Sequence, residues 1–185
     1  MTIPEQSGKP AILLSQMGSF ELLFKQQYPF VCQVIFKYVR EKSKVEDIAQ
    51  EIFAELWVKK DVIQIHTSIG AYLRRMAISR ALNYIRDTKK YNWDELDLAS
   101  EGVQEFTTQN ITILDSLEES ELRKKIENAI DQLPEKCRIV FLLSRHDELS
   151  YAEISRQLSI SIKTVENQIG KALKHLRSAL KDSRG

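Results

Sequence analysis

The chain has 185 residues, of which 43% are hydrophobic and 29% charged, and this suits one medium globular domain or two small ones. The formal net charge is +1, so the chain is neither a polyanion nor a polycation. No apolar run approaches the ~20 residues that span a bilayer, and this excludes a membrane-spanning protein. The N-terminus also lacks the basic start and long apolar core of a signal peptide, so we expect a cytoplasmic protein without membrane insertion.

The near-zero net charge hides an alternation along the chain. Residues 59–90 carry eight basic residues and two acids, and residues 91–121 carry nine acids with no Lys or Arg. Residues 122–181 carry twelve basic residues and seven acids. The acidic segment would repel DNA and favour a basic channel, whereas the flanking basic segments favour nucleic acid.

Apolar residues recur at helical spacing through the N-terminal half. Residues 20–38 trace one helical face, in which Pro29 predicts a break. Serines are placed to open a second helix over residues 43–59 and a third over residues 68–89. The second helix is predicted to turn four apolar side chains inward: Ile48, Ile52, Phe53 and Leu56.

The C-terminal half repeats the helical pattern after a stretch of weak periodicity. That stretch is rich in acidic, Ser, Thr, Asn and Gln residues and reads as a linker. Four helices are expected beyond it, over residues 118–133, 135–145, 150–158 and 161–181. No strand pattern is found. The predicted fold is therefore all-α, with two small helical domains over residues 18–90 and 118–181 joined by an acidic linker over residues 91–117.

Residues 148–176 have the layout of a helix-turn-helix. Ile154 and Leu158 lie on one face of a short helix, and Ile160 fills the corner. Ser161 then caps a second helix, whose inward stripe is expected to be Val165, Ile169, Leu173 and Leu176. The opposite face is expected to carry side chains suited to reading a major groove: Lys163, Thr164, Asn167, Gln168, Lys171 and Lys174. The pattern predicts binding of duplex DNA, with a helical hairpin bearing a solvated basic face as the alternative.

Two motifs in chain order resemble those of one protein family. Residues 133–176 resemble region 4 of bacterial sigma factors, and Val45-Glu-Asp-Ile-Ala-Gln-Glu-Ile-Phe-Ala-Glu-Leu-Trp57 resembles region 2.2. Residues 68–86 resemble regions 2.3 and 2.4. With regions 2 and 4 alone, the chain is similar to the extracytoplasmic-function (ECF) class of the sigma-70 family over roughly residues 18–180. The resemblance implies a factor that binds core RNA polymerase and directs promoter-specific initiation, recognising −35 duplex and melted −10 DNA.

The resemblance assigns region 2.2 to docking on the clamp helices of the largest polymerase subunit. One face of the predicted helix carries, at i, i+3, i+4 and i+7, the residues Asp47, Gln50, Glu51 and Ala54. A polar, acidic face suits a basic partner. Ordinary solvated helix charge is the alternative reading of the two acids.

Regions 2.3 and 2.4 imply capture of the −10 strand as it opens. This step needs a pocket for a flipped base and basic side chains that hold the single strand. The loop over residues 61–67 and the helix after it are expected to supply Ile63, Arg74, Arg75, Ser79, Arg80, Asn83 and Arg86. Arg74 and Arg75 would grip phosphates, and Ile63 would lie near the flipped base. Trp57 and Tyr72 are expected to be core residues rather than stacking platforms.

The remaining segments also receive expected partners from the resemblance. The acidic linker would thread polymerase toward the RNA exit path, with a solvated tether as the alternative. Residues 135–145 would hold the flap tip of the second-largest subunit, which leaves residues 163–174 to read −35 DNA. Gly170 marks a close approach to DNA or to a neighbouring helix, or is a tolerated surface glycine. Many members of the class are restrained by an anti-sigma factor, a partner that no residue here indicates by itself.

Two other function classes account for less of the sequence. A free-standing helix-turn-helix regulator would explain the C-terminal half, but not the docking motif and basic helix of the N-terminal half. An enzyme is not expected, because no Gly-rich phosphate loop, metal-ligand set or converging nucleophile and base is found. His66, His146 and His175 are predicted to lie at the surface, and Cys32 and Cys137 to be buried. We expect no metal and no cofactor.

Overall fold

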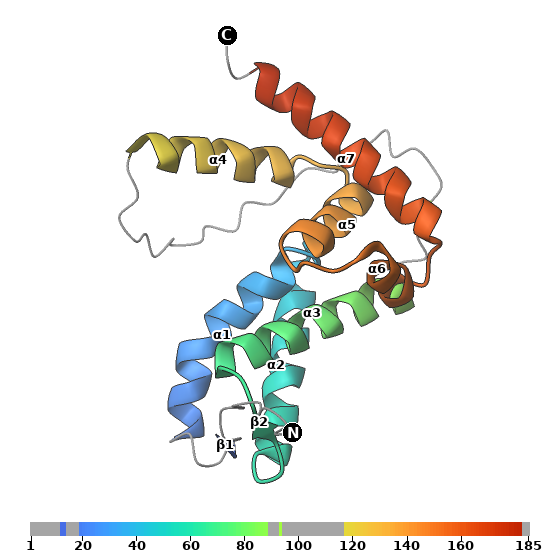
Figure 1. Ribbon diagram of the computed structural model, residues 1–185. Helices are drawn as coiled ribbons and strands as arrows, with labels where there is room; N and C mark the ends of the chain where they lie inside the picture. Colours follow the sequence, from blue (N-terminus) through green and yellow to red (C-terminus); the bar gives the residue numbers. More distant parts are fainter. Residues whose placement is uncertain (1–11, 14–18, 89–92, 94–116, 183–185) are drawn as a thin grey trace, which may run out of the picture. The chain divides into compact units, whose positions relative to one another are not determined.

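The computed structural model describes residues 12–13, 19–88, 93 and 117–182 (Figure 1). Its helices are α1 (Phe20–Phe36), α2 (Lys42–Lys59), α3 (Ile69–Thr88), α4 (Leu117–Asp131), α5 (Glu135–Arg145), α6 (Tyr151–Leu158) and α7 (Ile162–Asp182). Two short strands, β1 (Ile12–Leu13) and β2 (Gln64–Ile65), pair antiparallel. Contacts divide the chain into two compact units, Met1–Ile85 and Arg86–Gly185.

The predicted all-α class is confirmed by these helices. The expectation of no strand is wrong at β1 and β2, which are too short and too far apart in sequence to show an alternating pattern. The linker predicted over residues 91–117 lies outside the described residues, apart from Trp93 and Leu117. The predicted domain limits stay predictions.

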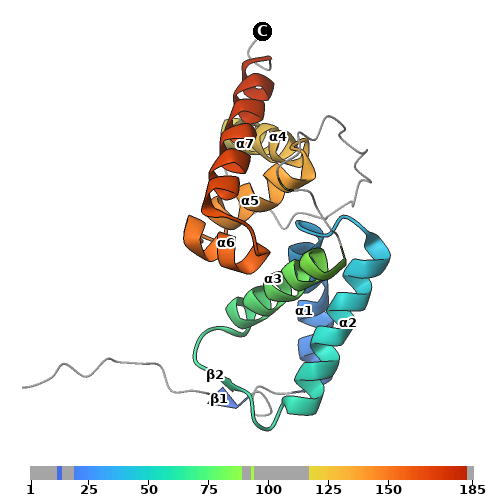
Figure 2. The same cartoon turned by 90° about the vertical axis from the view of Figure 1, so that its right-hand side faces the viewer.

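The N-terminal unit is built on the contact between α1 and α2, with α3 lying along one side of the pair in both views (Figures 1 and 2). The apolar faces of all three helices meet in its interior. The largest fully buried side chains are Val31, Ile35, Tyr38, Val39, Ile52, Leu56, Leu73 and Ile85. The four side chains predicted to point inward from the second helix are all buried, which confirms that face.

Helix starts in this unit follow the predictions in part. Pro29 lies inside a continuous α1, so the predicted break is wrong; the ring sits on the exposed side of the helix. Glu41, not Ser43, occupies the N-cap of α2, and the Ser43 hydroxyl donates to the Glu41 carboxylate at 3.2 Å. Ser68 does open α3, where its Oγ accepts a hydrogen bond from the Ala71 amide at 3.2 Å.

In the C-terminal unit, α7 contacts α4, α5 and α6. Ala129 and Leu133 pack with Cys137 of α5 against Ala172 and Leu176 of α7. Figure 2 shows α6 beside the start of α7, which gives the helix-turn-helix. The four predicted helices of this half are therefore confirmed, with ends that differ by one or two residues.

Local capping explains where these helices begin. Pro134 precedes α5, where its fixed φ and missing N–H cost nothing. Ser150 and Glu153 form a capping box at α6: the Ser150 Oγ accepts from the Glu153 amide, and the Glu153 carboxylate accepts from the Ser150 amide at 2.9 Å. Ser161 caps α7 by accepting from the Thr164 amide at 3.0 Å. In the described part of the chain, no helix is long and apolar enough to cross a membrane.

The capping box gives a stability prediction. Replacing Ser150 by Ala removes the acceptor for the Glu153 amide, and this should lower the free energy of unfolding by about 1 kcal/mol. Urea unfolding followed by circular dichroism measures the change. Ser178→Ala, an exposed position within α7, is the matched control and should be neutral or slightly stabilising.

The same box predicts a pH dependence. Hydrogen bonds from Ser150 lower the pKa of Glu153. The interaction therefore stabilises the fold above the unfolded-state pKa of that carboxyl and is lost as pH falls through its folded-state pKa. The difference between the Ser150→Ala variant and the wild type should shrink at acid pH. An undiminished difference would show that the carboxylate plays no part.

Candidate functional site

The turn between α6 and α7 is held by local hydrogen bonds. Ser159 ends α6 in the left-handed region, with φ 56° and ψ 44°. The Ser155 Oγ donates to the Ile160 carbonyl at 2.5 Å, and the Ile160 amide donates back to the Ser155 carbonyl at 3.0 Å. Ile154 is fully buried and Leu158 is 4% exposed, so the short helix is fixed to α7 by its apolar face. The predicted helix-turn-helix geometry is thus present.

The outward face of α7 is narrower than predicted. Lys163, Asn167 and Lys174 are exposed and Lys171 is half-buried, as expected for that face. Thr164 and Gln168 are only 7% and 1% exposed, so their predicted exposure is wrong. The inward stripe runs through Val165, Gln168, Ile169, Ala172 and Leu176, and Leu173 is only half-buried. The two misplaced residues therefore belong to the inward side of the helix.

Both polar ends of the Gln168 amide are used inside the unit. Its Nε2 donates to the Trp93 carbonyl at 2.7 Å, and its Oε1 accepts from the Cys137 Sγ at 3.1 Å. A buried amide must be satisfied in this way, because an unpaired polar group in the interior costs free energy. Gln168 consequently links α7 to α5 and to the described residue of the linker.

Gly170 belongs to the exposed side of α7. A Cβ placed there meets nothing within 4 Å, so close packing against a neighbouring helix is not the reason for the glycine. Gly170 follows Lys163 and Asn167 at i+7 and i+3, on the same outward stripe. Two explanations for a glycine at this position are compatible with its exposure: close approach of the helix backbone to DNA, and a tolerated surface residue.

The predicted docking face of α2 is exposed. Asp47, Gln50, Glu51 and Ala54 are all exposed, whereas Ile48 and Ile52 between them are buried. Asp47 is paired at 3.4 Å with Lys44, and both side chains remain largely open to solvent. The helix therefore presents a continuous polar surface with two carboxylates.

Three of the arginines predicted to hold single-stranded DNA are engaged within the protein. Arg75 donates to the Thr67 hydroxyl at 3.1 Å, Arg86 lies 3.0 Å from the Asp87 carboxylate, and Arg80 pairs with Glu55 of α2. Ser79 is exposed and Arg74 and Asn83 are half-buried, with Arg74 making interactions of its own. Of the candidate residues on α3, only Arg75, Ser79 and Arg86 are exposed.

Glu55 is a residue that the sequence reasoning missed. Its carboxylate accepts from Lys59 at 2.6 Å and from Arg80 on α3, and these hydrogen bonds, Lys59 first, lower its pKa. The spacing of Glu55 and Lys59 in the helix was visible in the sequence, but the pairing with Arg80 requires α2 and α3 to be packed together. Glu55 therefore supplies Arg80 with a carboxylate partner inside the unit.

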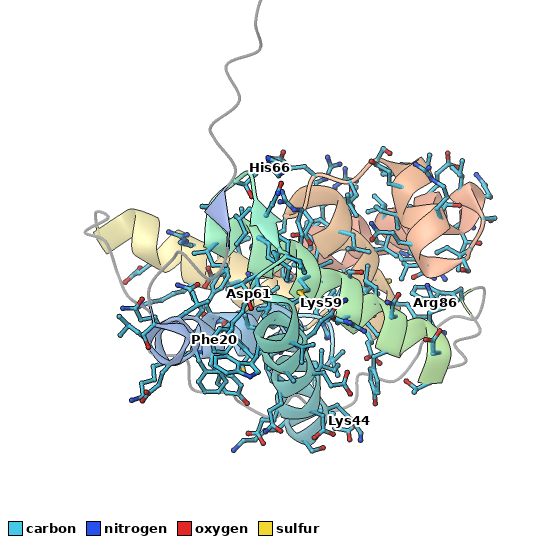
Figure 3. The ribbon with its side chains drawn as sticks, turned by 90° about the horizontal axis from the view of Figure 1, so that it is seen from below. Phe20, Lys44, Lys59, Asp61, His66 and Arg86 are labelled. Atoms are coloured by element: carbon cyan, nitrogen blue, oxygen red, sulfur yellow. The ribbon has the colours of Figure 1, made fainter. Side chains whose placement is uncertain are left out.

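The loop before α3 is anchored at several points. The amides of Val62 and Ile63 both donate to the Lys59 carbonyl at 3.0 Å, and Ile65 is 3% exposed. Ile63 is half-buried, and Gln64 and His66 are exposed. Figure 3 shows Asp61 near Lys59 at the end of α2 and His66 beyond it, close to β1.

Trp57 is not the core residue that was predicted, because 52% of it is exposed. Its ring contacts the Phe20 ring edge-on at a centroid distance of 5.0 Å, and the Lys60 ammonium lies 3.5 Å from its ring centroid. Phe53, one turn earlier, takes the interior position instead. Tyr72 is half-buried, so it is neither a full core residue nor an open platform for base stacking.

The cysteines and histidines are where they were expected. Cys32 and Cys137 are free and buried, and the three histidines are exposed. Burial is the main reason why the pKa of the Cys32 thiol is raised, which makes a thiolate less available. The described residues contain no group of three or more potential metal ligands.

Comparison with known protein families matches both halves of the chain. The family model described as Sigma-70 region 2 matches residues 23–91, and the one described as Sigma-70, region 4 matches residues 123–176.

Curated relatives match over most of the chain. The ECF RNA polymerase sigma factor SigW of Bacillus subtilis is 30% identical over 156 residues, covering 82% of this chain and 83% of its own. The RNA polymerase sigma-H factor of Pseudomonas aeruginosa is 26% identical, covering 88% and 86%. The ECF RNA polymerase sigma factor SigK of Mycobacterium ulcerans is 24% identical, covering 91% and 89%. A solved structure of CnrH in complex with the cytosolic domain of CnrY overlaps with a TM-score of 0.42 at 21% identity, covering 94% of this chain and 97% of that one.

Gln168 and Asn167 are adjacent on α7, and alanine substitutions at the two positions should change the stability of the fold by different amounts. Gln168→Ala leaves the Trp93 carbonyl and the Cys137 thiol without their amide partner, and should lower the free energy of unfolding by about 1–3 kcal/mol. Asn167→Ala removes an exposed amide and should change that free energy by less than about 0.5 kcal/mol. Urea unfolding of both variants measures the difference. Equal stability of the two would remove Gln168 from the interior network.

Proposed function

The chain belongs to the extracytoplasmic-function class of the sigma-70 family and directs promoter-specific transcription initiation by RNA polymerase, and we propose how its two units divide this work. The N-terminal unit docks on core polymerase and holds the opened −10 strand. The C-terminal unit reads the −35 element as duplex. One observation carries the proposal: an exposed acidic face on α2 and a capped, basic helix-turn-helix occur in the same chain.

Core docking is assigned to the exposed face of α2. Asp47, Gln50, Glu51 and Ala54 offer carboxylates, an amide and a small side chain to a basic helical partner, the clamp helices of the largest subunit. Charges at the rim of such an interface set the encounter rate and the orientation of the partners. The buried residues between them hold the helix in place, so the face is preformed.

Strand capture is assigned to the loop over residues 61–67 and to α3. Ile63 borders the position of the flipped base, and Arg74, Arg75, Ser79, Arg80, Asn83 and Arg86 line the path of the strand. Arg80 would exchange the Glu55 carboxylate for a phosphate. The exchange replaces one charge-assisted hydrogen bond of the Arg80 guanidinium by another.

Reading of the −35 duplex is assigned to the outward stripe of α7. Asn167 is the base reader, since its amide is free to pair with adenine in the major groove. Lys163, Lys171 and Lys174 contact phosphates or guanine, and Gly170 allows the helix backbone to approach the groove. Thr164 and Gln168 are not carried into this proposal, because both are buried.

Further partners follow from the same assignment. The flap tip of the second-largest subunit would bind at α5, where Phe141 and Ser144 remain half-exposed and Arg145 exposed. An anti-sigma factor would act by covering the α2 face or the outward stripe of α7. The relatives are sigma factors, which are not enzymes, and the proposal needs no catalysis by this chain. It places the protein in the cytoplasm, with the chromosome and the polymerase.

The docking face gives the experiment that tests the proposal. Wild-type protein with core polymerase should produce run-off transcripts from specific promoters, and Asp47→Lys with Glu51→Lys should abolish core binding because two carboxylates become like charges of the partner. Co-purification with core enzyme and run-off transcription measure both effects. Glu21→Lys with Glu127→Lys makes the same change in charge at exposed positions outside α2 and should keep core binding.

Tight duplex binding by the pure protein, together with no binding to core, would instead establish the free-standing regulator. Retained core affinity in the Asp47 and Glu51 variant would remove those residues from the docking face.

The α7 stripe gives a separate prediction about sequence preference. Asn167→Ala should weaken discrimination at one −35 base pair by ~1–3 kcal/mol, because one good base contact is lost. Selection of −35 sequences by the polymerase complex measures this change. Lys174→Ala should weaken binding to all sequences alike and lower its salt dependence. An unchanged preference in the Asn167 variant would contradict the assignment.

A further inference from the structure

The base-capture loop, residues 61–67, is fastened mostly by its own neighbours in sequence. The amides of Val62 and Ile63 donate to the Lys59 carbonyl, and the hydroxyl of the last loop residue, Thr67, accepts from Arg75 in the second turn of α3. Ser68 then caps α3. These contacts fix the two ends of the loop.

The middle of the loop is fastened by a segment from far earlier in the chain. β1 pairs antiparallel with β2, with Ile12 opposite Ile65 and Leu13 opposite Gln64. Figure 3 shows the two strands side by side near His66. Ile65 is buried at 3% exposure, while Gln64 and His66 on either side of it are exposed. The strand pairing therefore involves a segment whose side chains alternate between buried and exposed: Ile65 points inward, and its polar neighbours Gln64 and His66 point outward.

Register decides which side chains such a segment presents. Successive side chains of a strand point to opposite faces, so a slip of one residue would turn Gln64 and His66 inward and expose Ile65. Burial of Ile65 opposes that slip, and the backbone pairing with β1 opposes it further. A two-residue pair is marginal on its own, so a change confined to β1 should be enough to release it.

We propose that Ile12 and Leu13 form a positioning strand that sets the register of the base-capture loop, so that the segment before helix α1 contributes to −10 discrimination. The inference rests on the assignment of residues 61–67 to the −10 strand. An ordered loop pays less conformational entropy when it receives a base, and it offers the same side chains each time. The strand contacts no DNA itself; it acts through Gln64 and Ile65.

Two truncations of the full chain test the proposal. Deletion of residues 2–13 removes β1, and deletion of residues 2–9 is the matched control that keeps it. Each is assembled with core polymerase and assayed on promoters that carry each of the four bases at every −10 position. Losing the backbone bonds of a two-residue pair should reduce discrimination at one or more of these positions about fivefold or more. The control should discriminate like the wild type.

A proline scan keeps the test independent of truncation. Only alternate residues of an antiparallel strand point their N–H at the partner, so of Ile12→Pro and Leu13→Pro one removes a ladder bond and the other does not. We expect one of the two variants to lose discrimination and the other to keep it. Circular dichroism and co-purification with core enzyme should be unchanged in both.

The outcomes separate this inference from the proposed function. Discrimination equal to wild type in the longer truncation and in both proline variants would overturn the positioning strand, while run-off by the wild type would leave the sigma-factor assignment standing. Failure of the wild type itself to direct run-off would overturn the proposed function and the inference with it. Loss of core binding in the longer truncation would also overturn the inference, because β1 would then act on docking rather than on the loop.

Discussion

The buried stripe of α7 is the constraint on which the C-terminal unit depends. Three other helices pack on it, and Val165, Ile169, Ala172 and Leu176 supply the apolar contacts. Because a helix has a limited circumference, every residue given to the interior is lost to the outward face. The stripe includes Gln168, whose amide is satisfied by Cys137 and by the Trp93 carbonyl. The outward row that we propose for DNA is therefore narrow, with Asn167 at its centre.

The helix α2 meets a similar pair of demands in the N-terminal unit. Its buried side, from Val45 to Leu56, packs on α1, and its exposed side carries the two carboxylates assigned to docking. Glu55 lies at the boundary between the sides and reaches Arg80 on α3. One helix thus borders both the face that we propose for docking and an arginine that we propose for strand capture.

Electrostatics explain why such a chain should depend on polymerase for its DNA binding. Arg75, Arg80 and Arg86 already have acceptors within the protein, and Lys163 is paired with Glu166 at 3.2 Å on the outward side of α7. For these four side chains, a phosphate contact as proposed would therefore replace an existing partner rather than add a new interaction. Two weak contacts on separate units become selective when one large partner holds both at a fixed spacing.

What the sequence by itself determined is local. Pro134, Ser150 and Ser161 mark helix starts because a cap acts within one turn, and the motifs around Asp47 and Asn167 identified the family because they are contiguous. Only the tertiary structure decided that Gln168 turns inward, that Trp57 stays exposed, that Glu55 pairs with Arg80, and that β1 joins β2. Residues at the edge of an apolar stripe can face either way on an isolated helix, and strand pairs between distant segments leave no periodic signal. Their placement depends on which neighbour packs beside them, a non-local free energy that no stretch of sequence carries alone.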